Sequence, residues 1–433
     1  MKKSCFYIPG ILMAVQLFTL MQSANAQDTL SLQRCYQLME ELHPEEQSRI
    51  YAENIRQLKQ ENLNTAFLPQ FAVNGQATYQ SDVMSIPIES PAFSIPDIPK
   101  DQYKIQLEVS QLIYDGGVNK IKKTQEELNE KSTKTEINLN QRQVKSQINS
   151  LFFTALNLQE QERLLNESVL GELQNQLKLT EARIKNGVLL KGAANSIQIE
   201  ILKIKQDLLN VNEQQKAVFK MLKSWTGLDN LQEYDLLYPS YDITDNSNTD
   251  FDSKPQIQIL SLQQQQLEVS KDMIQAGNMP MLSAFANAGF GSPNPYNMFE
   301  TSFEPFYLLG LRLNWQPFKY GNTHRSVEVS KLQQSALEAR KESINKQSDV
   351  NLLQYQQDAE RLQKLIETDQ EMIVLQEDNV KEYGSLQQNG VITSTEYLTE
   401  VNKLTQFQLN LQIHKMSLAK AKVDWMFEAG ILK

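Results

Sequence analysis

Residues 186–190 read Asn-Gly-Val-Leu-Leu, and residues 389–393 read Asn-Gly-Val-Ile-Thr. The second motif follows the first at an offset of 203 residues (390 − 187), and the same offset separates Gly227-Leu228 from Gly430-Ile431 (430 − 227). An Asn-Gly pair is a turn signal, and glycine is common where a helix ends. A long element repeated at a fixed period indicates a chain built from two equivalent halves.

An apolar stripe in a common register follows each Asn-Gly turn. Its positions are three, four or seven residues apart, which predicts a helix with a narrow buried seam, as in a coiled coil. All seven positions of the first copy are apolar, and five of the seven equivalent positions in the second copy are apolar. The first copy has Ile201, Ile204, Leu208, Val211, Val218, Leu222 and Trp225, and the second has Leu404, Phe407, Leu411, His414, Ala421, Trp425 and Glu428.

The same order of elements occurs twice along the chain. We predict a first repeat at residues 27–227, a polar connector at 228–254 and a second repeat at 255–433. Within each repeat the sequence predicts a helix, two strands and a long helical hairpin. The strands are expected at about 70–81, 102–113, 281–291 and 306–316, and the hairpins at about 118–226 and 323–429.

Each predicted strand alternates apolar and polar residues over about ten positions, which is the length of a tilted transmembrane strand. Tyr103, Ile105 and Leu107, for example, alternate with polar neighbours. Four strands cannot close a barrel, and open strand edges are prohibitive in lipid. A trimer would supply 12 strands (3 × 4) and 12 long helices. The predicted fold is therefore mainly α with a small transmembrane β part, in which three chains share a twelve-stranded β-barrel and a twelve-helix α-barrel.

The N-terminus has the pattern of a secretory signal. Lys2-Lys3 precede an apolar run at residues 11–20, and Ala24-Asn25-Ala26 forms a small-residue cleavage site, so residues 1–26 are the predicted signal peptide. Its removal leaves Cys35 as the single cysteine, so no intramolecular disulfide is expected. The chain has 52 acidic and 42 basic residues, which argues against nucleic acid as a partner.

The order of elements resembles the TolC-like outer-membrane efflux protein family. The resemblance rests on the duplicated pattern and on short motifs: Leu68-Pro69-Gln70, Ile113-Tyr114-Asp115-Gly116-Gly117, Asn186-Gly187-Val188, Trp315-Gln316-Pro317-Phe318 and Asn389-Gly390-Val391. It implies a homotrimeric channel in the outer membrane of a Gram-negative bacterium, with its barrel in outer-membrane lipid and a helical tunnel projecting into the periplasm. It also implies a periplasmic adaptor (membrane fusion) protein and an inner-membrane transporter as partners in efflux or type I secretion.

The resemblance further implies that the adaptor binds at the two hairpin tips. The candidate docking residues are Asn186, Gly187, Val188, Leu189, Asn389, Gly390, Val391 and Ile392. A simpler interpretation is that each glycine only permits positive φ between two helices. Under the docking interpretation, the valine and its neighbour would be exposed apolar residues that await a partner.

Two acidic residues follow the second tip. Glu396 and Glu400 lie one turn apart on the same helix face. The resemblance implies that acidic residues here narrow the closed end of the tunnel, although Ile392 stands where the family has a basic residue. Three Glu396 carboxylates near the axis would favour cations and raise one another's pKa. The alternative is a solvated acidic face near a helix N-terminus.

Other classes of protein fit the sequence less well. A periplasmic adaptor would have one hairpin with β-rich flanks, and an exported coiled-coil structural protein would not need alternating strands. We find no phosphate loop, nucleophile elbow or dinucleotide fingerprint, so no cofactor and no enzyme activity are expected. The three histidines are scattered, which makes a metal site unexpected, and His414 should pack on its apolar seam.

Overall fold

The computed structural model describes residues 29–84, 98–241, 243, 251–297 and 300–432. The predicted signal peptide, residues 1–26, lies outside the described residues. The chain divides into two compact units. Unit 1 comprises the described residues of Met1–Glu46, Asn140–Phe251 and Lys346–Lys433, and unit 2 comprises those of Gln47–Leu139 and Asp252–Asn345. Each unit therefore takes residues from both predicted repeats.

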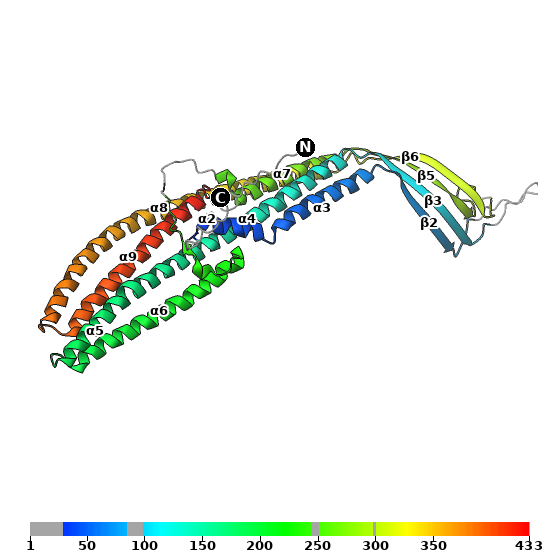
Figure 1. Cartoon of the computed structure of the whole chain (residues 1–433). Helices are drawn as coiled ribbons and strands as arrows, with labels where there is room; N and C mark the ends of the chain where they lie inside the picture. Colours follow the sequence, from blue (N-terminus) through cyan, green and yellow to red (C-terminus); the bar gives the residue numbers. More distant parts are fainter. Residues whose placement is uncertain (1–28, 85–97, 242, 244–250, 298–299, 433) are drawn as a thin grey trace, which may run out of the picture. The chain divides into compact units, whose positions relative to one another are not determined.

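Helices make up most of the described chain, which confirms the prediction of a mainly α fold (Figure 1). None of the described helices has the combined length and apolar content needed to cross a bilayer. The helices are α2 (Leu32–Leu42), α3 (Glu46–Thr65), α4 (Val118–Arg163), η1 (Leu164–Leu170), α5 (Gly171–Lys185), α6 (Lys191–Thr226), η2 (Leu231–Glu233), η3 (Phe251–Ser253), α7 (Pro255–Ala276), α8 (Asn322–Gln388) and α9 (Ser394–Glu428).

The long strands form one antiparallel sheet in unit 2, in the order β2-β3-β5-β6. These strands are β2 (Gln70–Tyr79), β3 (Asp101–Tyr114), β5 (Met281–Ser292) and β6 (Glu304–Asn314). Pro69 and Pro280 directly precede β2 and β5. Proline favours extended backbone in the residue before it, so each helix ends and each strand begins at this point. The central pair, β3 with β5, joins the two repeats.

The fourth strand ends earlier than the predicted 306–316. β6 ends at Asn314, and Trp315 has left the ladder, because its indole N–H donates to the Asn278 carbonyl oxygen at 3.0 Å. Pro317, two residues later, has no N–H to donate, so the ladder could not have continued through it.

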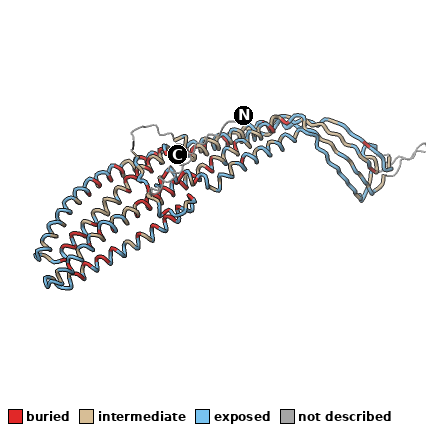
Figure 2. Tube along the Cα trace, in the orientation of Figure 1, coloured by how far each residue is buried: buried red, intermediate tan, exposed pale blue. Residues whose placement is uncertain are grey.

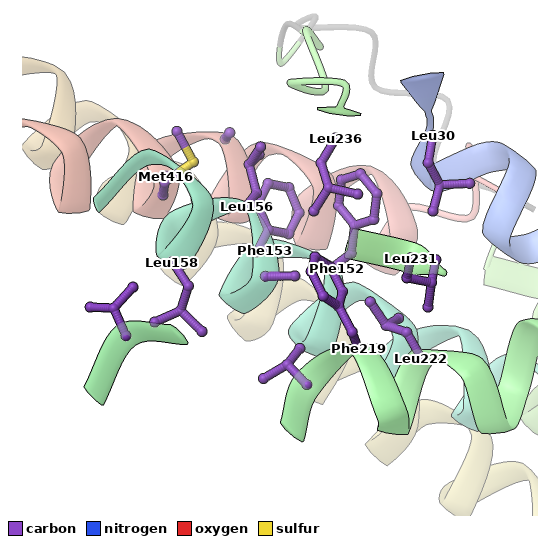
Figure 3. Close-up of a cluster of buried hydrophobic side chains, with 14 of the residues drawn as sticks. Leu30, Phe152, Phe153, Leu156, Leu158, Phe219, Leu222, Leu231, Leu236 and Met416 are labelled. Atoms are coloured by element: carbon purple, nitrogen blue, oxygen red, sulfur yellow. The ribbon is translucent and has the colours of Figure 1, made fainter. Parts of the chain in front are cut away.

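Buried side chains are concentrated in unit 1, whereas the sheet residues are mostly exposed or half-buried (Figure 2). The core of unit 1 lies where α2 packs on the long helices, and Phe152, Phe219 and Leu222 meet there (Figure 3). Tyr36 of α2 is buried in this core, and its hydroxyl donates to the Asn149 side-chain oxygen. Burial raises the pKa of the Tyr36 phenol, so the group remains a neutral donor. This bond fixes α2 to α4.

The connector after α6 is partly built into the core, although its composition predicts only a polar link. Strand β4 (Asp235–Leu236) pairs in parallel with β1 (Thr29–Leu30) at the start of the described chain. Leu231 and Leu236 are buried. The Gln159 amide holds the connector to α4, because it donates to Tyr234 O at 3.1 Å and accepts from Leu236 N at 3.2 Å. The pairing of β4 with β1 cannot be predicted from the polar composition of the connector alone.

The two hairpins differ in length by one residue. Gly117 and Gly321 have φ values of 88° and 74°, and each carbonyl accepts an N–H bond from the fourth residue beyond it. They are therefore equivalent, at an offset of 204 (321 − 117). The turn glycines Gly187 and Gly390 are equivalent at an offset of 203 (390 − 187). The first arm of the first hairpin thus contains one residue more than the matching arm, α8.

The extra residue lies in η1, which is a π-helical segment between α4 and α5. A π-helix bonds each N–H to the fifth preceding residue, so one wider turn accommodates one more residue. The buried residues Leu165, Val169 and Leu173 are four apart here, whereas buried positions of α8 keep a spacing of three and four. The seam consequently stays in register on both sides of η1.

We expect the deletion of Asn166, an exposed residue of η1, to convert the segment into regular α-helix and to leave the hairpin folded. Deletion of Gln370, the exposed equivalent in α8, should rotate the following residues by about 100° and expose the seam. Each large side chain removed from the seam should lower the free energy of unfolding by on the order of 2–5 kcal/mol. Far-UV circular dichroism and thermal unfolding in detergent measure both variants. Equal loss of helix in the two would contradict the assignment of the extra residue to η1.

Candidate functional site

The sheet of unit 2 has one apolar face, which the strand register defines. Leu107, Ala288 and Tyr307 are cross-strand partners on this face, and so are Val109, Ala286 and Leu309 one step further along. Tyr307 and Leu309 are 79% and 71% exposed in the single chain. Phe71, Val73, Ile105, Leu311 and Leu313 lie on the same face. An apolar sheet face that none of the described residues covers is suited to contact lipid.

The opposite face of the sheet is polar. Asn74 donates to the Glu108 carboxylate at 3.1 Å, and the Arg312 guanidinium lies 5.0 Å from the centre of the Phe285 ring. Gly310 directly opposes Phe285 and leaves room for its ring. This alternation of an apolar and a polar face is the pattern of a membrane barrel with a wet interior.

Aromatic residues lie toward both ends of the apolar face. Tyr79 and Tyr103 lie at the loop end of β2 and β3, and Tyr114 and Trp315 lie where the chain leaves the sheet for the helices. All four side chains are about half exposed or more. Tyrosine and tryptophan are enriched where a protein crosses the membrane–water interface, since each has an apolar body and a polar tip.

The two helix–helix turns in unit 1 have the same backbone. In the first, the Val188 N–H bonds to Arg183 O at 2.9 Å and the Gly187 N–H to Ile184 O at 3.0 Å. In the second, the Val391 N–H bonds to Leu386 O at 3.0 Å and the Gly390 N–H to Gln387 O at 3.2 Å. This pair of bonds is the Schellman motif, which requires positive φ at the residue that glycine occupies in both turns.

The turn residues singled out from the sequence differ in exposure. Val188 is 69% exposed and Val391 68% exposed, whereas Leu189 and Ile392 are half-buried. Asn186 and Asn389 are exposed beside the glycines. Each tip therefore presents one valine, and the residue after it packs back onto the hairpin. Leu190, which the sequence reasoning passed over, is the most exposed of these apolar residues at 85%.

Glu396 and Glu400 have different local roles. Glu396 is exposed and closes a capping box with Thr393, because its carboxylate accepts from the Thr393 N–H at 2.7 Å and hydroxyl at 2.9 Å. These bonds, that of the backbone first, lower the pKa of the Glu396 carboxyl. Glu400 is buried against α8 and accepts from Lys403 and from Gln376, both at 2.8 Å. Lys403 and then Gln376 lower the pKa of the Glu400 carboxyl.

Two polar contacts in unit 1 were not predicted. Tyr397 of α9 is buried, and its hydroxyl accepts from Gln176 at 3.3 Å and donates to Glu172 at 3.5 Å on α5. Burial raises the pKa of Tyr397 to about 12, so its hydroxyl stays protonated and can donate. His414 does not only pack on an apolar seam, because its Nδ1 lies 2.5 Å from the buried Asp369 carboxylate. Among the described residues, no group of three or more His, Cys, Asp or Glu side chains could hold a metal ion.

A family model described as "Outer membrane efflux protein" matches residues 59–228. This segment is thus similar to outer membrane efflux proteins. The match includes both strands of the first repeat, both arms of its hairpin and the tip between the arms. It confirms the resemblance drawn from the Asn-Gly turns and the alternating strands. No curated protein matches the sequence.

Solved outer membrane efflux protein structures have the fold of the whole chain. CusC is similar with a TM-score of 0.69 and 12% identity, over 95% of this chain and 95% of CusC. VceC of Vibrio cholerae is similar with a TM-score of 0.66 and 14% identity, over 92% and 96%. The open state of the MtrE channel of Neisseria gonorrhoeae gives 0.63 and 14%, over 93% and 89%. The fold thus extends beyond the matched segment into the second repeat.

The buried Glu400 should make hairpin stability depend on pH. Its pKa is lowered in the folded chain, so its ionised form contributes stability above the usual carboxyl range, and this is lost as the pH falls through the lowered pKa. Glu400→Gln should lower the unfolding temperature by about 2–4 °C at pH 7 and by less at pH 3. Calorimetry measures this, with Glu367→Gln, an exposed residue of α8, as the control. A difference that does not change with pH would contradict the role of the charge.

Proposed function

We propose that this protein is the outer-membrane channel of a tripartite efflux or type I secretion system. The observation that carries the proposal is a four-stranded sheet with one apolar and one polar face, in a chain that also has two long helical hairpins. The family match of residues 59–228 and the shared fold of outer-membrane channels support it. The protein is a passive duct without enzyme activity, and a partner transporter supplies the energy.

The channel is a homotrimer in the outer membrane of a Gram-negative bacterium. β2 and β6 each have an edge with unpaired backbone groups in the single chain, and unpaired groups are prohibitive in lipid. Joining β6 of one copy to β2 of the next would close a barrel of 12 strands (3 × 4). The helices also have an uncovered apolar surface in the single chain, because Ile199, Leu202 and Leu209 form an exposed stripe on α6. A second copy that covers this stripe would continue the helical ring into the periplasm.

The hairpin tips are the contact points for a periplasmic adaptor, and through it for an inner-membrane transporter. The exposed valines, Val188 and Val391, and the half-buried Leu189 and Ile392 support this assignment. Both tips, where α5 meets α6 and α8 meets α9, lie at the same end of unit 1, so one partner could reach them together (Figure 1). The Asn186-Gly187 and Asn389-Gly390 pairs hold the valines outward.

Glu396 and Glu400 form the candidate constriction. Glu396 keeps its charge exposed while it caps α9, so its carboxylate is available to passing ions. Glu400 is engaged by Lys403 and Gln376 and would hold the helix face in place. Three copies of Glu396 around the axis would favour cations over anions.

Extraction of the outer membrane should give three copies of the chain in one particle. Three copies are expected because twelve strands make up the proposed barrel, whereas two or four chains would give eight or sixteen strands. Native mass spectrometry in detergent measures the copy number. A monomeric particle, or release of the protein by a wash without detergent, would contradict both the barrel and the channel.

Glu396→Gln should remove the charge and keep the cap, because glutamine also serves at this position of a capping box. We expect the permeability ratio of cations over anions to fall at least about twofold. Planar-bilayer recordings of the isolated channel measure this ratio. Glu382→Gln, which removes an exposed acidic residue just before the same tip, is the control. An unchanged ratio in Glu396→Gln would exclude this residue from the constriction.

A further inference from the structure

The two hairpin tips share a backbone but differ in chemistry. Leu190 stands at the position of Thr393, and Ala193 at the position of Glu396, at the common offset of 203 (393 − 190). Thr393 and Glu396 cap α9 reciprocally, whereas no side chain caps the N-terminus of α6. Leucine is among the least favourable residues at this position. The first tip thus exposes an apolar side chain at the position where the second tip has a residue that caps the N-terminus of α9.

The charges around the tips differ in the same way. Within nine residues of the turn glycine, the first tip has four basic residues and one acidic residue, and the second has one basic and two acidic residues. Lys185 and Lys191 of the first tip are exposed, and Arg183 is half-buried. In the described part of the chain, no ion pair holds any of these three side chains. Their charge is therefore directed to the surroundings.

Polar groups of the second tip form hydrogen bonds with one another. The Glu396 carboxylate accepts from Thr393, and Ser394 is buried and accepts a bond from the Gln387 amide at 3.4 Å. Lys185 and Lys191 correspond to Gln388 and Ser394 of this tip (388 − 185 = 394 − 191 = 203). Hence the two positions that give the first tip its exposed positive charge are uncharged in the second.

We propose that the first tip is the principal docking surface, and that its partner is a protein segment with an apolar end flanked by acidic residues. This rests on the proposed function, since it concerns the same tips. Leu190 and Val188 would enter the apolar end, and Arg183, Lys185 and Lys191 would meet the acidic flanks. Side chains that become fully buried at the centre of an interface contribute most to binding, and the charges around them set specificity.

An anionic membrane surface would also attract a basic, apolar tip. Surface-binding segments, however, usually insert aromatic as well as aliphatic side chains over several turns. Residues 178–196 contain no phenylalanine, tyrosine or tryptophan. Among the large apolar side chains of the turn, Val188 and Leu190 are the exposed ones. Two aliphatic side chains fit a small pocket in a protein better than a bilayer.

Replacement of first-tip residues by their second-tip counterparts tests the proposal in the full-length protein. Leu190→Thr with Ala193→Glu gives the first tip the capping box, and Lys185→Gln with Lys191→Ser gives it the uncharged residues of the second. Lys381→Gln, which removes an exposed lysine just before the second tip, is the matched control. The probe is the purified periplasmic adaptor of the same bacterium, with binding measured by biolayer interferometry at two salt concentrations. Thermal unfolding confirms that each variant is folded.

Both first-tip variants should bind the adaptor at least about tenfold more weakly, and the lysine variant should also lose salt dependence. The second-tip variant should bind within about twofold of the unchanged protein. Equal losses in both tips, or no loss in the first, would overturn the proposal and leave the channel function intact. Failure of the unchanged protein to bind the adaptor would instead overturn the docking role itself. Loss of binding to phosphatidylglycerol vesicles, with adaptor binding retained, would assign the tip to the membrane.

Discussion

The hydrogen bonds missing from the outer edges of β2 and β6 are the constraint on which the rest of the structure depends. A sheet with an apolar face is stable in lipid only if every backbone N–H and C=O is paired, and four strands cannot pair all of theirs. In the proposed channel, other copies of the chain would supply these bonds. The helices would then form a ring rather than a globule, which accounts for seams that are narrow and surfaces that stay polar.

The duplicated order of elements supplies the strands and helices that this fold needs. Each repeat contributes two strands and one hairpin, and β3 with β5 joins the repeats at the centre of the sheet. The two repeats differ in two places. One arm has one residue more than the other, which η1 accommodates within a single turn, and the helix after the first turn lacks the side-chain cap that α9 has. The framework of hydrogen bonds at both turns is unchanged.

The sequence contained the features that repeat. The alternation around Ile105, the glycine turns and the seams each follow a fixed period, so they predicted the strands, the hairpins and the fold class. Contacts without a period could not be predicted in this way. The pairing of β1 with β4 joins residues about two hundred positions apart, and Asp369 reaches His414 only because α8 and α9 pack in one particular register. The tips were found from their glycines, but the difference between them lay three residues beyond the first glycine, at Leu190.

The short pair of β1 with β4 bears on the order in which the chain assembles. The Leu30 carbonyl accepts a bond from the Leu237 N–H at 3.0 Å, so the earliest described strand waits for a partner from the middle of the chain. A protein that enters a compartment with its N-terminus first must therefore leave β1 unpaired until residue 237 has arrived, although Asn149, the partner of Tyr36, arrives much earlier.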